Sequence, residues 1–275
     1  MNQKLKYISR IKDEFDTVIS GVNGVFTFGN SINAESIEAL IKIYQDGKKI
    51  ALASNTAMRA KDLYRFLKHS NVPVNIFYAL ITAGEIAHFY LKNHHDLGHA
   101  YYSLSGNLSK VMEGLEYRPV ESPVMADFIL AENDSNGLES SQISSILEQI
   151  LYLRLPLLCI GNNTSLVSEK GVVAGVGAIA EQYAMMGGQV ISFGKPDVRI
   201  ASYLLEGFKT NKSRCLVIGD CMSTDMRMGS HFGAKTLLLT KGVHKMDSSN
   251  IEAQLNSLSE NYGFTIDYYM EQLQW

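Results

Sequence analysis

The sequence predicts an α/β protein built on a parallel sheet. Short apolar runs alternate with amphipathic segments along most of the 275 residues, and several of the runs end in polar or glycine-containing loops. Strand, helix, strand and helix in short succession favour parallel strands joined by right-handed crossovers. A chain of this length that is 46% hydrophobic buries a sizeable core and is long enough for two domains.

The first part of the chain carries the clearest alternation. We expect a short amphipathic helix at residues 8–15, and then two apolar runs around a glycine-containing turn at 18–29. A helix at 33–45 and a buried strand at 50–53 follow. Apolar residues at helical spacing predict another helix at 60–69.

The middle of the chain has a different sequence pattern, because its expected strands are flanked by polar or Gly/Pro loops such as ENDSNG and GNNTS. This pattern suits an inserted α/β unit. The expected elements are strands at 101–104, 128–131 and 157–160, and helices at 83–93, 108–115, 140–151 and from about 176.

The last part returns to the first pattern. A strand at 189–193 leads into a helix with Pro196 in its first turn, where proline is well tolerated. A strand at 216–218, a helix at 226–232 and a strand at 236–239 follow. Beyond them we expect a polar C-terminal part that ends at Trp275.

Composition excludes several classes of partner. The net charge of −3 comes from interspersed acidic and basic residues, so neither nucleic acid nor an anionic membrane surface is expected as a partner. The N-terminus is charged and lacks the apolar stretch of a signal peptide, and no run approaches a membrane span. Three cysteines without metal-ligand spacing are expected to be free thiols in a reducing cytoplasm.

Two carboxylates follow a buried strand in the stretch VIGDCMSTD. Asp220 and Asp225 lie in the loop after the strand, at the sheet edge where open α/β proteins bind ligands. Such carboxylates are suitable oxygen ligands for Mg²⁺. Helix N-capping by Thr224 or Asp225 is the competing interpretation.

Three further residues are candidates for holding a phosphate group. Lys195 lies between a strand and a helix start, where its charge can neutralise a phosphoryl group; a solvated surface lysine is the alternative. Ser54 and Asn55 end the second strand, where hydroxyl, amide and backbone N–H groups can hold phosphate oxygens. Serine and asparagine are also common where a loop begins, and this is the alternative interpretation of Ser54 and Asn55.

Three other motifs have plain structural explanations. Asn23-Gly24 is a strong signal for a type I′ hairpin turn. The cluster HHDLGH (His94, His95, Asp96 and His99) has metal-binding residue types but is favoured as a solvated loop. GVGAIA at 175–180 is similar to a dinucleotide loop, yet it lacks a clear preceding strand and the later acidic residue.

Taken together, four blocks of the sequence resemble the haloacid dehalogenase-like superfamily, in its class IIA branch of NagD-like phosphatases. The blocks are GVNGVFTFGN, LASNTA, GKPD and VIGDCMSTDMRMGSHFGAKTLLLTKGV, and the resemblance covers nearly the whole chain. It implies a Rossmann-like core with a parallel sheet at residues 1–81 and 190–275, and an inserted α/β cap of the C2 type at 82–189.

The resemblance also implies roles for single residues. Ser54 matches the phosphate-holding Ser/Thr of the family, Lys195 its phosphate lysine, and Asp220 with Asp225 its metal carboxylates. The first block of the family reads DxDGV, or in some members DxWGV, where the first Asp is the nucleophile and a magnesium ligand and the second is the general acid/base. Gly21 and Asn23 occupy these two positions here.

A missing nucleophile implies impaired catalysis, because losing one typically costs on the order of 10⁴ to 10⁶ in rate. We therefore expect a phosphatase homologue, a pseudoenzyme that is inactive or weakly active and retains a cleft for a small phosphorylated metabolite or an anion. Mg²⁺ is expected to bind weakly or not at all. The alternatives are an active Mg²⁺-dependent hydrolase of a small phosphorylated metabolite without a covalent intermediate, and a structural partner protein with a vestigial cleft.

Overall fold

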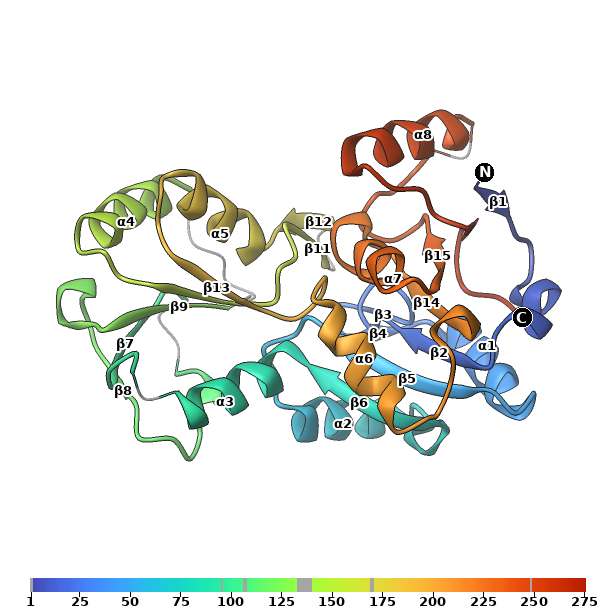
Figure 1. Cartoon of the computed structure of the whole chain (residues 1–275), viewed down its shortest axis with the longest axis horizontal. Coiled ribbons are helices and arrows are strands. Elements are labelled where there is room, and N and C mark those ends of the chain that lie inside the picture. Colours follow the sequence, from blue (N-terminus) through green and yellow to red (C-terminus); the bar gives the residue numbers. More distant parts are fainter. Residues whose placement is uncertain (1, 95, 106–107, 133–139, 169–170, 248) are drawn as a thin grey trace.

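The computed structural model describes the whole chain except residues 1, 95, 106–107, 133–139, 169–170 and 248. Two parallel sheets, each covered by helices, form two lobes that lie side by side (Figure 1). The expected α/β class with a parallel sheet is therefore confirmed.

The larger sheet has seven strands in the order β1-β16-β15-β14-β2-β5-β6, and every pair of neighbours in it is parallel. Its strands are β1 (Gln3–Lys4), β2 (Thr17–Ser20), β5 (Lys49–Ser54), β6 (Phe77–Thr82), β14 (Cys215–Gly219), β15 (Lys235–Leu239) and β16 (Tyr268–Met270). Because β14, β2 and β5 are adjacent, the loops that follow them meet at one edge.

Helices cover both faces of this sheet. Side chains alternate along each strand, so Val18 of β2 faces α1 (Ala34–Gln45) and α2 (Ala60–His69), while Ile19 faces the opposite layer. That layer contains α6 (Val198–Glu206), α7 (Arg227–Phe232) and α8 (Ile251–Tyr262). Burial on both faces explains why these strands read as continuous apolar runs.

The second sheet has five parallel strands in the order β13-β10-β9-β7-β8. They are β7 (Ala100–Ser103), β8 (Arg118–Pro119), β9 (Phe128–Glu132), β10 (Leu157–Ile160) and β13 (Val190–Phe193). Helix α3 (Ala83–Asn93) packs on one face, and α4 (Ser140–Tyr152) and α5 (Val176–Met185) pack on the other. The expected cap limit at residue 189 thus falls just before β13, which pairs with β10 in this second sheet.

Two small hairpins complete the strands: β3 (Thr27–Phe28) with β4 (Ser31–Ile32), and β11 (Ser165–Ser168) with β12 (Gly171–Ala174). The expected type I′ turn at Asn23-Gly24 is wrong. Only Gly24 has a positive φ, +80°, whereas a type I′ turn needs positive φ at both residues. The first hairpin turns instead at residues 29–30, between β3 and β4.

Several local expectations are also wrong. Residues 108–115 contain only a 3-10 turn at Lys110–Met112, whereas the short helix expected at 8–15 is present as a 3-10 helix at Ile8–Glu14. Pro196 follows a cis peptide bond and precedes α6, whose N-cap is Asp197, so it does not lie in the first turn. The C-terminal part contains α8 and β16, and a strand, β12, does precede the GVGAIA segment, although in an antiparallel hairpin.

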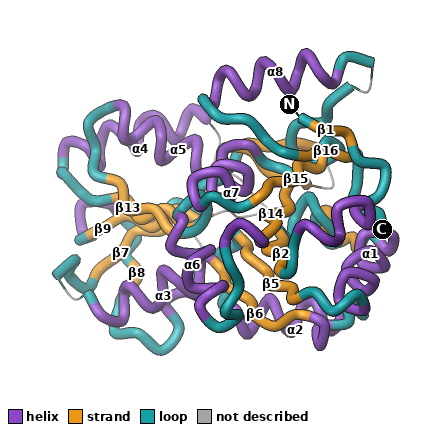
Figure 2. Tube along the Cα trace, turned by 45° about the vertical axis from the view of Figure 1, so that its right-hand side comes forward, coloured by secondary structure: helices purple, strands orange, loops and turns teal. Residues whose placement is uncertain are grey.

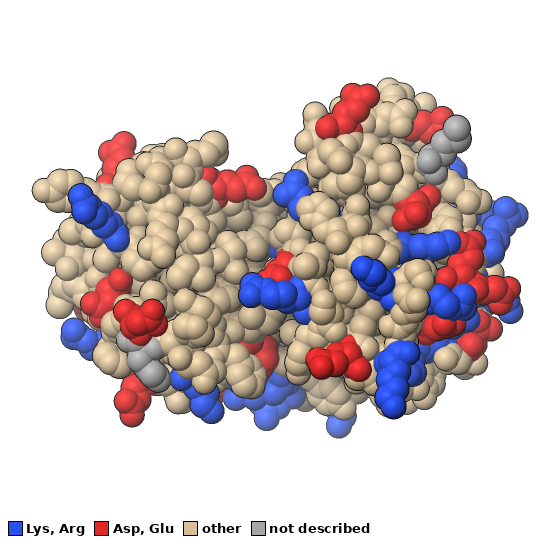
Figure 3. Space-filling view, in the orientation of Figure 1, with Lys and Arg blue, Asp and Glu red and all other residues tan. Residues whose placement is uncertain are grey.

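Both ends of the chain lie on the lobe of the larger sheet (Figure 2). The first and last segments of the chain contact each other there, because Ile8 N–H donates to the Gln274 carbonyl and β1 pairs with β16. On the face seen in Figure 3, basic and acidic side chains are interspersed. Within the described residues, no helix has the length and apolar character needed to cross a lipid bilayer.

Candidate functional site

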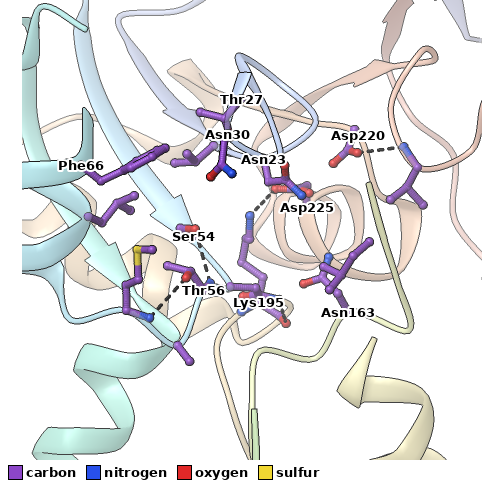
Figure 4. A pocket seen from close by; sticks show the side chains of 18 residues that line it. Asn23, Thr27, Asn30, Ser54, Thr56, Phe66, Asn163, Lys195, Asp220 and Asp225 are labelled. Atoms are coloured by element: carbon purple, nitrogen blue, oxygen red, sulfur yellow. Dashed lines mark hydrogen bonds and ion pairs between the residues drawn. The ribbon is translucent and has the colours of Figure 1, made fainter. Parts of the chain in front are cut away.

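A pocket of about 310 Å³ opens where the loops after β14, β2 and β5 meet the second lobe. Its described lining contains most of the residues that the sequence singled out, and Figure 4 shows their side chains directed toward a common space. Its lining includes Asn23, Ser54, Asn55, Thr56, Met58, Leu63, Phe66, Asn163, Leu166, Lys195, Asp220, Asp225 and Val243.

Lys195 enters the site directly after β13 and is only 5% exposed. Its Nζ donates to Asp225 Oδ1 at 2.7 Å and to the carbonyl of Ala53 at 2.8 Å. The Asn55 side chain fixes its main chain, since Lys195 N–H donates to Asn55 Oδ1 and Asn55 Nδ2 donates to the Lys195 carbonyl. Asn55 therefore positions the lysine.

Asp220 follows β14 and is 4% exposed. Its Oδ2 accepts the backbone N–H of Val243 at 2.9 Å. Burial, followed by the nearby negative charge of Asp225, raises the pKa of Asp220 to about 7. A proton or a cation is thus favoured at this carboxylate.

Gly21 lies directly after β2, against the second carboxylate. A Cβ atom at position 21 would lie 3.2 Å from Asp225 Oδ1 and 3.2 Å from Val25 Cγ2. Lys195 Nζ is 2.7 Å from the same Asp225 oxygen, so position 21 lies against the carboxylate oxygen that holds Lys195. Asn23 lines the pocket two residues later and bridges to Thr27.

The hydroxyl oxygens of Ser54 and Thr56, at and just after the end of β5, each accept a backbone N–H from the residue two positions later. Ser54 Oγ accepts the N–H of Thr56 at 3.4 Å, and Thr56 Oγ1 accepts the N–H of Met58 at 3.2 Å. Each oxygen acts as an acceptor in these bonds, which leaves its O–H as a donor toward the pocket. A phosphate oxygen is a matching acceptor.

The second lobe contributes one side of the pocket through Asn163 and Leu166. The contact between lobes is close: Gly161 has φ +88°, and a Cβ atom there would lie 2.1 Å from the Asn55 carbonyl oxygen. The Oδ1 atom of Asn163 is buried and has no hydrogen-bond partner among the described residues. Figure 4 places this side chain beside Lys195, on the side away from Phe66.

Other residues considered from the sequence lie elsewhere. Asp16 pairs with Arg214 at 2.6 Å before β2 begins, and the Ser20 hydroxyl donates to the Gly21 carbonyl at 2.8 Å. Within the HHDLGH cluster, His95 lies outside the described residues. His94 is exposed and stacks on Tyr90 with 4.0 Å between ring centroids, as suits a solvated loop.

Sequence reasoning missed four parts of the site: Thr56, Phe66, Asn163 and the N–H of Val243. Thr56 stands two residues after Ser54 in SNT, and Asn163 belongs to the polar GNNTS loop, so both had a signal as strand-end polar residues. The pattern of α2 assigned Phe66 to the core, and a backbone N–H carries no sequence signal at all.

The donor set fits Mg²⁺ only in part. Asp220 and Asp225 are the oxygen ligands that Mg²⁺ takes, but Asp225 is already paired with Lys195 and Gly21 offers no side chain. The described residues contain no group of three or more His, Cys, Asp or Glu placed to hold a metal ion. The ligands that remain for Mg²⁺ are the carboxylates of Asp220 and Asp225 together with the oxygens of a bound phosphate.

Comparison with known proteins adds a family context. The HAD-hydrolase-like family model matches residues 192–261, a range that contains Lys195, Asp220 and Asp225. Mouse chronophin is 23% identical over 271 residues, which cover 93% of this chain and 90% of that protein. Phosphoglycolate phosphatase 2 of Arabidopsis thaliana is 36% identical over 72 residues, 26% of this chain and 23% of that enzyme's length.

Similarity of fold extends over the whole chain. The crystal structure of a haloacid dehalogenase-like hydrolase from Brucella suis superposes with a TM-score of 0.82 at 20% identity. The match covers 98% of this chain and 99% of that one. The two-lobed architecture is therefore shared throughout.

Proposed function

Because this chain belongs to the haloacid dehalogenase-like superfamily, within the branch of class IIA, NagD-like phosphatases, we propose that it binds a small phosphorylated molecule or anion in this pocket and hydrolyses it weakly or not at all. The observation that carries the proposal is Gly21. Its position lies against the Asp225 oxygen that pairs with Lys195, where the resemblance calls for an aspartate nucleophile, and it has no side chain to attack phosphorus.

The residues at positions 21 and 23 support loss of turnover. Covalent phosphoryl transfer needs a nucleophile held near phosphorus, and Gly21 supplies none. Residue 23 is an asparagine, which cannot shuttle a proton as an aspartate can. Both side chains expected to perform chemistry are thus absent.

Anion binding is supported by what remains. Two of the three ammonium hydrogens of Lys195 are used within the protein, which leaves one for a ligand. The hydroxyls of Ser54 and Thr56 add two donors at the same strand end. Donors fixed by backbone contacts before a ligand arrives lose little freedom on binding.

Phosphatases of this superfamily generally use Mg²⁺, and the proposal includes weak binding of that ion by Asp220 and Asp225. When bound, Mg²⁺ neutralises charge on phosphate oxygens. The raised pKa of Asp220 opposes this, since the carboxylate must lose its proton to become a ligand. Binding of Mg²⁺ is therefore expected to strengthen above pH 7.

Two measurements on the native chain test the proposal. We expect hydrolysis of p-nitrophenyl phosphate with Mg²⁺ to lie at least about 10⁴-fold below a competent enzyme, in line with a lost nucleophile. We also expect calorimetry to detect orthophosphate binding that weakens in Ser54→Ala. Ser202→Ala, an exposed change on α6, is the matched control and leaves binding unchanged.

The two alternatives correspond to opposite results. Robust turnover by the native chain would show a Mg²⁺-dependent hydrolase that acts without a covalent intermediate, and the proposal would be wrong. If orthophosphate binds neither in the presence nor in the absence of Mg²⁺, the cleft is vestigial and a structural role is the better account.

A further inference from the structure

The pocket also has an apolar side. Three side chains form it, and we call them the apolar wall: Met58, Leu63 and Phe66. Figure 4 shows Phe66 on the side of Ser54 that faces away from Lys195 and Asp220. The polar and apolar ends of the pocket are therefore separated.

The wall is built largely before any ligand arrives. Leu63 is 3% exposed in the core under the larger sheet, and Phe66 of the same helix packs against that core. Met58, 41% exposed, stands nearer to solvent. A preformed apolar surface favours ligands with an apolar body.

The charges that line the pocket disfavour ligands with more than one anionic group. Lys195 is the only cationic side chain among the described lining residues, and its ammonium already neutralises Asp225. A ligand with a second anionic group, such as a carboxylate or another phosphate, would bring an unpaired charge next to the apolar wall. Burying such a charge is costly.

Volume sets the size of the ligand. A dry cavity of about 150 Å³ accommodates benzene, and this pocket measures about 310 Å³. It has room for a phosphate group together with one ring or a short chain.

We propose that the apolar wall makes the pocket selective for phosphate monoesters whose only charged group is the phosphate and whose body is a single ring or a short apolar chain. The inference rests on the proposed binding of phosphate at Lys195 and Ser54. It adds the class of ligand to that site.

Calorimetry with three probes separates the two levels of the proposal. Orthophosphate tests the anion site alone, phenyl phosphate adds an apolar ring, and phosphoglycolate adds a second charge. We expect phenyl phosphate to bind about tenfold or more tightly than orthophosphate, because the ring buries apolar surface. Phosphoglycolate is expected to bind no more tightly than orthophosphate.

The outcomes differ for the two proposals. If orthophosphate binds and phenyl phosphate gains nothing over it, the ligand class proposed here is wrong while phosphate binding stands. If phosphoglycolate binds most tightly, the charge argument is refuted. If none of the three probes binds, the underlying anion site fails as well.

Variants of the wall provide the second test. Phe66→Ala is expected to remove most of the advantage of phenyl phosphate while orthophosphate affinity stays within about twofold. Phe89→Ala, a change at an exposed phenylalanine of α3 outside the pocket lining, should leave both affinities unchanged. Equal loss for both probes in Phe66→Ala would contradict a role in ligand choice.

A more exposed wall position guards against misfolding of Phe66→Ala. Met58→Lys introduces a cation at the rim of the wall, and we expect it to reverse the preference, so that phosphoglycolate binds more tightly than phenyl phosphate. Unchanged preference in a folded Met58→Lys protein would show that the wall does not contact the ligand body.

Discussion

Lys195 Nζ lies 2.7 Å from Asp225 Oδ1, and the two side chains are among the most buried charged groups in the described part of the chain. This buried pair joins the chain after β13 to the loop after β14. Each charge depends on the other, because both side chains are almost fully buried.

Removing the cation of this pair is expected to destabilise the protein. Lys195→Met leaves the Asp225 carboxylate buried without its partner, which should lower the free energy of unfolding by about 3 kcal/mol or more. Arg199→Met breaks an exposed ion pair with Asp197 and should cost less than about 1 kcal/mol. Urea unfolding of both variants measures the difference; equal losses would show that Asp225 is solvated.

Restoring the missing carboxylate is expected to restore function in stages. A Cβ at position 21 needs its neighbours to move by only a few tenths of an ångström, since its two closest contacts are at 3.2 Å and the backbone φ is not positive. Gly21→Asp should therefore fold, bind Mg²⁺ more tightly and gain a little turnover of p-nitrophenyl phosphate. Gly21→Asp with Asn23→Asp should gain more, because an aspartate at 23 can transfer protons.

Gly21→Asn is the control for this restoration, since it fills the same space without a charge. It should leave Mg²⁺ affinity and turnover at the native level. If the double aspartate variant melts at the native temperature, binds Mg²⁺ and still shows no turnover, the remaining groups are not arranged for phosphoryl transfer. A structural partner protein with a vestigial cleft would then be the better account.

Much of the larger sheet was predictable because its strands are buried on both faces and read as apolar runs. The helix at 60–69 was predicted with its observed limits, and the strand at 157–160 likewise. The helix predicted at 108–115 is absent, since the apolar residues Val111 and Met112 pack into the second lobe from a 3-10 turn. Tertiary packing, and not the helical spacing of the apolar residues, determined the conformation of this segment.

For the site, strand-end loops predicted that Gly21, Ser54, Lys195 and Asp220 would converge at one edge of the sheet. Ser54, Lys195 and Asp220 line one pocket, and Gly21 lies against Asp225, which lines it too. The chemical roles of these residues, and of Gly21, stay predictions. What the sequence did not reveal is partnership: that Lys195 pairs with Asp225, and that Asn55 holds the Lys195 backbone. Such pairings depend on contacts between segments about 30 and 140 residues apart.

Stability is expected to fall as pH rises through the titration of Asp220. The pKa of this carboxyl is about 7 in the folded chain and 3.8 in the reference state. Between these values the folded protein holds a proton that the unfolded chain has lost, so the free energy of unfolding decreases from about pH 4 to pH 7. Asp220→Asn mimics the protonated group and should be the more stable protein at pH 8, by on the order of 2–4 kcal/mol, but not at pH 4.

Asp127 provides a control of opposite sign. Backbone N–H groups of Ala100 and His99 lower the pKa of its carboxyl, so its contribution is present at neutral pH and is lost as pH falls below about 4. Asp127→Asn should therefore destabilise the protein at pH 7, with the difference shrinking in acid. Urea midpoints from pH 4 to 8 measure both trends, and a pH-independent effect of Asp220→Asn would refute the assignment.

Backbone contact with Asp220 predicts a difference between two glycines. Gly24 and Gly47 both have φ +80°, but a Cβ at 24 would lie 1.9 Å from Asp220 Oδ2, while a Cβ at 47 meets nothing within 4 Å. Gly47→Ala should cost about 1–2 kcal/mol from the left-handed backbone alone. Gly24→Ala should cost clearly more and weaken Mg²⁺ binding by displacing the carboxylate; melting temperatures and calorimetry test this, and equal costs would argue against the close contact.

The β11–β12 hairpin pairs with neither large sheet, yet its Leu166 reaches the pocket. Exchanging or lengthening this hairpin would therefore leave both large hydrogen-bond ladders intact. The anion-holding residues Lys195 and Ser54 lie on other segments. New ligand specificities are thus best sought by replacing residues 165–174 with hairpins of varied sequence while the rest of the chain is left unchanged.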